Sequence, residues 1–203
     1  MDETLESVLP PNNDSYPLPC DRIFPPLLSI TERYFEPRFF IPQPARKLIS
    51  SGYLCGDQCM LFHSNRIGIV SIAPAHPLLK PGTVIKEVDF QVNYKLNRLE
   101  NKVSGKSKRG GQKVAETSPI CVVHTGGEQE TSYVLLAGMK GTLIEVNEKL
   151  SAQPNLLHER PWSEGYVAII LPNSRTFKIE KDNLMTHENY LKKISSKSTD
   201  SSD

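Results

Sequence analysis

Residues 138–172 read GMKGTLIEVNEKLSAQPNLLHERPWSEGYVAIILP, and this stretch sets the architecture that we expect for the whole chain. Residues 142–148 alternate between the two faces of a strand, with Ile144 and Val146 on the same face. The following leucines and proline predict a short irregular or single-turn segment. Residues 166–171 are almost wholly apolar, which favours a buried strand. The stretch therefore predicts two strands joined by a compact segment.

Short apolar runs separated by glycine- and proline-bearing turns occupy much of the remaining sequence. Period-two patterns of this kind are typical of strands, and frequent short strands favour a sandwich or a barrel. We expect further strands within residues 60–62, 66–73, 84–93, 99–103, 114, 120–124 and 133–137.

A helix is expected near the end of the chain. Thr186 is suited to the N-cap position, and Met185 can pack on Tyr190 as a hydrophobic staple. Tyr190, Leu191 and Ile194 share one face of that helix. We therefore expect this helix to dock on the sheet.

Length and composition predict one globular domain with tails. The chain has 203 residues, of which 38% are hydrophobic and 23% charged. Residues 1–30 are acidic and rich in proline, which predicts a disordered arm. Residues 31–51 form an aromatic arm or linker that either packs across the domain or grips a partner. We place the β domain at 52–194 and a disordered acidic tail at 195–203.

No feature of the sequence indicates export or membrane insertion. No apolar run reaches the roughly 18 residues that a membrane-spanning helix needs, and residues 1–9 are acidic where a secretory signal would be basic. Cysteines occur at Cys20, Cys55, Cys59 and Cys121. They are too few and too widely spaced for a secreted disulfide scaffold. We expect a soluble, intracellular chain with reduced thiols.

Four segments carry a resemblance to a known carrier protein. They are GTLIEVNEKL at 141–150, PNLLHERP at 154–161, EGYVAIILP at 164–172 and GKSKRGGQK at 105–113, followed by the helix after Leu184. Their order and spacing resemble the glycine cleavage system H protein over about residues 104–194. The resemblance implies a mainly β, barrel-sandwich hybrid fold of the biotinyl/lipoyl-carrier type with a C-terminal helix.

A lipoyl carrier needs a lysine at the apex of an exposed hairpin, because its amine carries the acyl arm. The resemblance places Glu130 at that position, and a carboxylate cannot form the amide. Lys140, in AGMKG at 137–141, echoes a biotin acceptor but falls at a strand entry. We therefore expect no lipoyl or biotinyl cofactor.

Over its length the chain resembles the Abitram (Simiate) family more closely. The segments that carry this resemblance are ERYF at 32–35, CGDQCMLFHSNRI at 55–67, AHP at 75–77, RLENKVSGKSKRG at 98–110, EVNE at 145–148 and EGYVA at 164–168. The resemblance implies an actin-binding transcription modulator without catalytic activity. It also implies a location in the nucleus, including nuclear speckles, and in the cytoplasm, including actin-rich projections.

Cys55, Cys59 and His63 have some of the spacing of a metal site. Structural zinc needs four ligands and usually a second close pair, which this sequence does not supply nearby. Buried thiols and a hydrogen-bonded histidine are the favoured interpretation. Neither a nucleophile elbow nor a phosphate-binding glycine loop is present, so we expect neither a metal centre nor an enzyme.

The strongest local charge asymmetry is a basic cluster opposed within the cluster only by Glu100. Its members are Arg98, Lys102, Lys106, Lys108, Arg109 and Lys113. The cluster is either a solvated turn or a docking surface for an acidic partner, and the net charge of +1 means that only such local clusters can attract one.

Three functions remain open. The first is an actin-binding protein, for monomers or filaments, that uses the basic cluster. The second is a nuclear adaptor associated with nucleic acid or with the transcription or splicing machinery, although base-specific recognition is not expected without exposed aromatic side chains. The third is a carrier-type protein, which the missing apex lysine disfavours.

Overall fold

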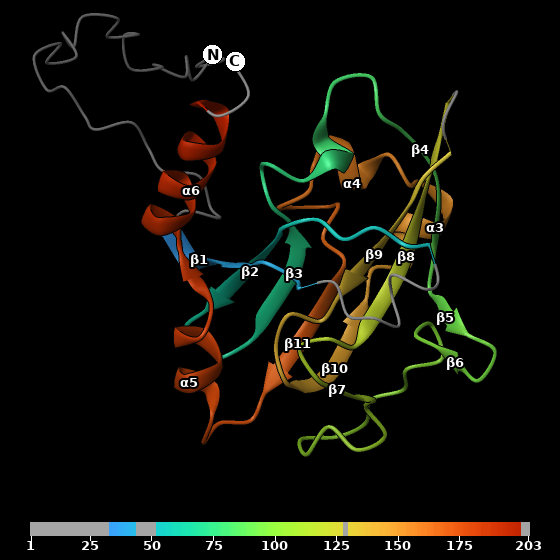
Figure 1. The fold of residues 1–203 in the computed structure, drawn as a ribbon. Helices are drawn as coiled ribbons and strands as arrows, with labels where there is room; N and C mark the ends of the chain where they lie inside the picture. The colour runs from blue at the N-terminus through green and yellow to red at the C-terminus, as the bar shows by residue number, and fades with distance from the viewer. Residues whose placement is uncertain (1–32, 44–51, 128–129, 200–203) are drawn as a thin grey trace, which may run out of the picture.

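Seven antiparallel strands form the larger sheet of this protein, in the computed structural model drawn in Figure 1. The structure describes residues 33–43, 52–127 and 130–199. The order across the sheet is β12-β1-β2-β3-β11-β10-β7. The strands are β1 (Phe35–Phe40), β2 (Gln58–His63), β3 (Gly68–Ile72), β7 (Lys113–Val114), β10 (Gly141–Val146), β11 (Ala168–Pro172) and β12 (Met185–Thr186).

A smaller sheet of order β4-β8-β9 faces the larger one across the main core. Its strands are β4 (Val84–Asp89), β8 (Pro119–Gly126) and β9 (Ser132–Leu136), and a separate hairpin pairs β5 (Gln91–Asn93) with β6 (Leu96–Asn97). The helices are η1 (Pro77–Leu79), α3 (Lys149–Ala152), α4 (Leu156–Glu159), α5 (Phe177–Asp182) and α6 (His187–Thr199). The mainly β fold class with a C-terminal helix is confirmed, in the form of sheets that do not close into one barrel.

The stretch from 138 to 172 forms the predicted pair of strands. β10 and β11 pair in antiparallel register, and the one-turn helices α3 and α4 occupy the segment between them. A β-bulge between Leu143 and Glu145 shifts the register. It sends Leu143 and Val146 into the core, while Ile144 is only half-buried. The predicted pairing of Ile144 with Val146 on one face is therefore wrong, because the bulge reverses the alternation.

Asn147 connects the two strands of this stretch. It is buried, and its Nδ2 donates to the carbonyls of Glu164 at 2.7 Å and Tyr166 at 2.8 Å. Its backbone N–H donates to the carbonyl of Val167 at 3.0 Å. These bonds satisfy the side-chain Nδ2 donors and the backbone N–H of a buried residue, and they fix the end of β10 against the entry to β11.

Two strand predictions differ from the structure. Residues 99–103 form a loop rather than a strand, and side chains instead of a backbone ladder hold that loop in place. The predicted strand at 84–93 is divided into β4 and β5 at Phe90, whose carbonyl accepts from the backbone N–H of Arg98 at 3.0 Å.

The β domain extends beyond the expected boundaries at 52 and 194. β1 comes from the aromatic segment at 31–51 and pairs with β2 over its full length, which makes it an inner strand of the sheet. Helix α6 continues to Thr199, past the expected end at 194. The arm at 1–30 and residues 200–203 lie outside the described residues.

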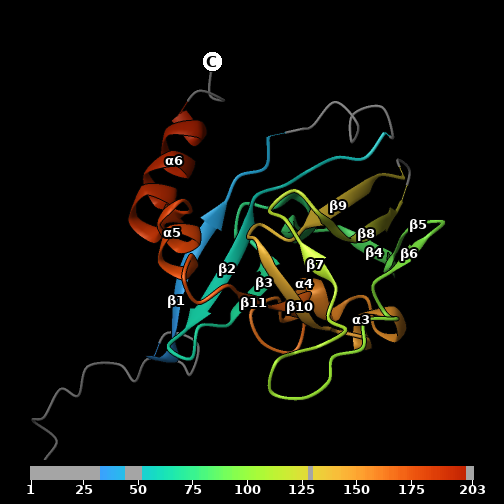
Figure 2. The ribbon, with the colours of Figure 1, turned by 90° about the horizontal axis from the view of Figure 1, so that it is seen from below.

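Helix α6 packs on the outer face of β1, away from the smaller sheet (Figure 2). The rings of Phe39 and Tyr190 stack with centroids 4.0 Å apart, and both are buried. Thr186 Oγ1 accepts from the Asn189 N–H at 3.3 Å, and Met185 joins the same apolar cluster. The predicted N-cap and the docking of the helix are therefore confirmed. Within the described residues, no helix has the length and apolar character needed to cross a membrane.

The fold places His76 in the core as the N-cap of η1. The ring is 1% exposed, its Nδ1 accepts from the Leu78 N–H at 3.1 Å, and it lies edge-on to Tyr133. A Cβ added at Gly56 would lie 2.4 Å from the ring, so glycine is needed at that position. Burial lowers the pKa of His76 to about 4.

Replacing Tyr190 with alanine should release α6 from the sheet. The loss of a buried aromatic ring is expected to lower the free energy of unfolding by about 3–5 kcal/mol, measured by chemical denaturation. Tyr190→Phe retains the ring stack and should change that free energy by no more than about 1 kcal/mol. Equal losses in the two variants would contradict the stacking account.

The buried His76 predicts a loss of stability in mild acid. The unfolded chain protonates this imidazole below about pH 6.5, whereas the folded chain does so only near pH 4. The free energy of unfolding should therefore fall by about 3 kcal/mol across that window through this group. His76→Asn keeps a capping acceptor but does not titrate. Its stability difference from the wild type should shrink as the pH falls, and a constant difference would refute the assignment.

Candidate functional site

A buried arginine anchors the basic loop to the sheet. Arg98 is 3% exposed, and its Nε and Nη2 donate to the Pro119 carbonyl at 3.0 and 2.8 Å. Its Nη1 donates to Gln112 Oε1 at 2.7 Å. Burial lowers the pKa of Arg98, yet the fork of its guanidinium is matched by these acceptors. Arg98 therefore joins the two ends of the loop instead of facing a partner.

Two amide side chains complete this anchor. Asn101 Nδ2 donates to the carbonyls of Leu143 and Ile144 at 3.1 and 3.2 Å, at the bulge of β10. Asn101 Oδ1 accepts from the Gln112 N–H at 2.8 Å, and Gln112 Nε2 donates to the Asn97 carbonyl at 3.0 Å. The loop is therefore held on β10 by a connected set of hydrogen bonds.

The tip of the loop is a tight turn that displays cations. Ser104 and Arg109 exchange backbone hydrogen bonds of 2.9 and 3.0 Å, and Lys108 has a left-handed backbone with φ of 51°. A Cβ at Gly110, where φ is 82°, would lie 2.5 Å from the Lys102 carbonyl oxygen, which requires glycine there. The exposed members of the predicted cluster are Lys102, Lys106, Lys108, Arg109 and Lys113. The structure thus brings the cluster to one loop and its flanking strand, except for the buried Arg98.

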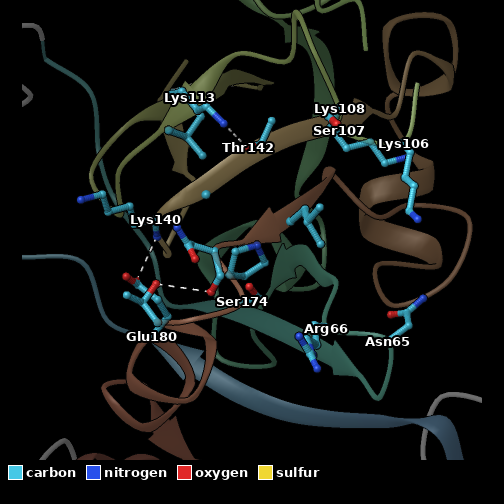
Figure 3. A pocket seen from close by; sticks show the side chains of 16 residues that line it. Asn65, Arg66, Lys106, Ser107, Lys108, Lys113, Lys140, Thr142, Ser174 and Glu180 are labelled. Atoms are coloured by element: carbon cyan, nitrogen blue, oxygen red, sulfur yellow. Dashed lines mark hydrogen bonds between the residues drawn. The ribbon is translucent and has the colours of Figure 1, made fainter. Parts of the chain in front are cut away.

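A cavity of about 710 Å³ opens beside this loop. Figure 3 shows Lys106 and Lys108 on one side of it, Lys113 and Lys140 on the other, and Arg66 between the two sides below. Lys113 Nζ donates to Thr142 Oγ1 at 2.5 Å. The Lys140 backbone N–H donates to Glu180 Oε2 at 3.1 Å, which places a carboxylate at the rim.

Arg66 and Lys140 were not part of the predicted cluster. Arg66 lies in the β2–β3 turn and Lys140 precedes β10, so each is more than 20 residues away in sequence from the tip of the basic loop. They join the cavity through the pairing of β3, β11 and β10. No local sequence pattern marks Arg66 as a cavity residue, because its left-handed backbone, with φ of 71°, is known only from the fold.

Glu130, which the sequence resemblance places at the lysine position of a carrier, lies in the loop between β8 and β9. It is exposed and forms an ion pair with Lys86 at 3.1 Å. Lys140, the lysine of the segment that resembles a biotin acceptor, lies at the entry to β10 and not at a hairpin tip.

Cys55, Cys59 and Cys121 lie in the domain interior or at its edge, and Cys20 lies outside the described residues. Cys59 is buried, which raises the pKa of its thiol to about 12, and burial also raises the pKa of Cys121. His63 Nδ1 accepts from the Asn65 N–H at 3.2 Å, and the His63 ring lies beside Phe35. In the described part of the chain, no three His, Cys, Asp or Glu side chains are grouped so that they could hold a metal ion.

Comparisons with known proteins show the family to which the chain belongs. The sequence model of the glycine cleavage H-protein family matches residues 92–197. The chicken (Gallus gallus) protein Abitram is 45% identical over 140 residues, which cover 68% of this chain and 79% of that protein. The chain belongs to the Abitram family.

Other members of the Abitram family match over a longer part of the chain. Protein Abitram of Xenopus tropicalis is 41% identical over 80% of this chain and 84% of its own length, and the human protein is 37% identical over 82% and 87%. Among solved structures, a glycine cleavage system H protein from Mycobacterium marinum aligns with a TM-score of 0.38 at 14% identity. That alignment covers 67% of this chain and 96% of the H protein.

Truncating Arg98 should destabilise the domain. Arg98→Ala leaves the Pro119 carbonyl and Gln112 Oε1 without their donor, so the free energy of unfolding is expected to fall by about 2–3 kcal/mol in urea denaturation. Arg98→Lys should recover less than half of this loss, because an ammonium group cannot reproduce the fork.

The exposed Lys102 of the same loop provides the control. Lys102→Ala is expected to change the free energy of unfolding by less than about 0.5 kcal/mol. If Arg98→Ala were as stable as Lys102→Ala, the side chain of Arg98 would not be the anchor of the loop.

Proposed function

We propose that this chain is a non-catalytic actin-binding protein that modulates actin assembly through the exposed tip of the basic loop. The observation that carries the proposal is a cationic turn that is preformed and displayed. Its exposed members are Lys102, Lys106, Lys108 and Arg109. None of them forms an ion pair within residues 33–43, 52–127 and 130–199. Such a surface suits an acidic protein face.

Family membership supports actin as the partner. The chain belongs to the Abitram family, and the resemblance of its sequence to that family implies actin binding. A rigid turn loses little conformational entropy on binding, so its charges can contribute to affinity as well as to the association rate. Monomeric and filamentous actin are both candidate partners, and action in the nucleus as well as in the cytoplasm belongs to the same proposal.

The distribution of perturbed groups supports a non-catalytic role. Among the described residues, the strongly shifted pKa values belong to Cys59, His76, Cys121, Tyr166 and Tyr190. None of these five residues lines the cationic cavity. An acid–base site would combine a perturbed group with access to substrate, and this combination does not occur at the cavity. The carrier function is disfavoured for a separate reason. Glu130 is a carboxylate, and a carboxylate cannot form the amide that would hold an acyl arm.

A role in direct nucleic-acid binding is less well supported by the same surface. The basic tip can contact phosphates, but it has no aromatic residue, and the exposed aromatic rings Tyr34, Tyr94 and Trp162 come from other segments. Stacking on aromatic rings provides much of the affinity for single strands. An adaptor role in transcription or splicing would therefore depend on protein contacts.

Charge reversal at the tip should weaken binding to actin strongly. Lys106→Glu, Lys108→Glu and Arg109→Glu together are expected to weaken co-sedimentation with filaments at least tenfold, which is about 1.4 kcal/mol. The reversal replaces attraction by repulsion at an acidic surface. The matched control reverses three exposed lysines elsewhere, Lys95, Lys149 and Lys178, and should co-sediment like the wild type.

Unchanged co-sedimentation of the loop variant would remove the basic tip from the proposal. The same variants should be titrated with an oligonucleotide at several salt concentrations. Phosphate binding predicts a slope of about 0.9 log units per neutralised phosphate in the salt dependence. Tight oligonucleotide binding with that slope, together with no actin binding, would favour the nucleic-acid adaptor instead.

A further inference from the structure

We propose that the cavity beside the basic loop is a binding site for a compact ligand that carries several phosphate groups. This inference goes beyond the proposed actin contact, since it concerns a concave site with two further cations, Arg66 and Lys140. The cavity of about 710 Å³ has the size of an ordinary small-molecule pocket.

The charge of the cavity is the first argument. Its lining includes five cations, Arg66, Lys106, Lys108, Lys113 and Lys140, against one carboxylate, that of Glu180. None of the five forms an ion pair within the described parts of the chain. Like charges that converge on a concave surface raise the local positive potential, which a polyanion relieves.

The backbone provides an independent second argument. Arg66 has φ of 71° and Lys108 has φ of 51°, and no other non-glycine residue in the described ranges has a positive φ. This conformation is uncommon for long side chains and usually favours glycine or asparagine. Both strained positions therefore carry a cation of the same cavity. Strain of this kind often accompanies a binding site.

The neutral polar groups of the lining can donate hydrogen bonds to phosphate oxygens. Thr142 and Ser174 place hydroxyl groups at the cavity, and Asn65 and Asn173 add amides (Figure 3 labels the first three). Lys113 is already positioned by its hydrogen bond to Thr142. Cations and neutral donors that surround the cavity suit a ligand with phosphates pointing in several directions, such as an inositol polyphosphate or a phosphoinositide headgroup.

Glycine substitutions can separate ligand binding from stability. Arg66→Gly and Lys108→Gly each remove a cation and also relieve a left-handed backbone, so the folded state should not be destabilised by strain. The probe is inositol hexakisphosphate, titrated by calorimetry into the full chain without actin. We expect saturable one-to-one binding for the wild type and about 10- to 100-fold weaker binding for each variant, because each loses charge-assisted hydrogen bonds.

The control variant carries Lys95→Gln and Lys149→Gln, which remove two charges outside the cavity. It should bind the probe like the wild type. The thermal unfolding midpoints of the glycine variants should not fall below that of the control. No saturable binding, or binding that the glycine variants leave unchanged, would overturn the proposal.

A second arm identifies the source of the phosphates. The full chain is floated with phosphatidylcholine vesicles that either contain or lack phosphatidylinositol bisphosphate. Flotation only with the phosphoinositide vesicles, reversed by the soluble probe, would identify a lipid headgroup. Binding of the soluble probe without flotation would identify a free polyphosphate. Because Arg66 lies outside the proposed actin contact, Arg66→Gly should still co-sediment with filaments, so failure of this proposal is distinguishable from failure of the actin proposal.

Discussion

The burial of one guanidinium determines the shape of the basic loop. A buried charge is tolerated only when its donors are matched, and Arg98 meets that condition through the Pro119 carbonyl and Gln112 Oε1. The acceptors lie at the start of β8 and at the end of the loop, so the side chain joins segments that no backbone ladder connects. Asn101 adds the contact to β10. The loop can therefore display its lysines on a fixed backbone without regular secondary structure.

The chain matches the H-protein family in sequence but lacks the lysine that the resemblance would require of a carrier. The family model of glycine cleavage H-proteins covers the half of the chain that contains β10, β11 and α6. Glu130, which the sequence resemblance places at the lysine position of a carrier, forms an ion pair with Lys86. The positive charge is concentrated instead on the loop and cavity on the β7–β10 side of the larger sheet.

The sequence predicted those elements that depend mainly on residues close together in the chain. The sequence predicted β11 because its apolar residues are consecutive. It also predicted the cap at Thr186 because the hydrogen bond there joins residues only three positions apart. The sequence did not predict the bulge at Ile144, because the bulge arises from the way in which β10 pairs with β11. Arg98 was predicted as a surface cation, because sequence spacing does not show that Pro119 lies within reach. The inclusion of Arg66 in the cavity likewise depends on the order of strands.

The most direct test of the account is amide hydrogen exchange across the full chain, with and without filamentous actin. If the fixed basic loop is the contact, added protection should be confined to peptides covering residues 102–113, while the β8–β9 hairpin around Glu130 stays unchanged. Because the loop is already ordered, its exchange should slow on binding without a change in the exchange of the β-sheet core. Protection at the β8–β9 hairpin, with residues 102–113 unaffected, would contradict the account.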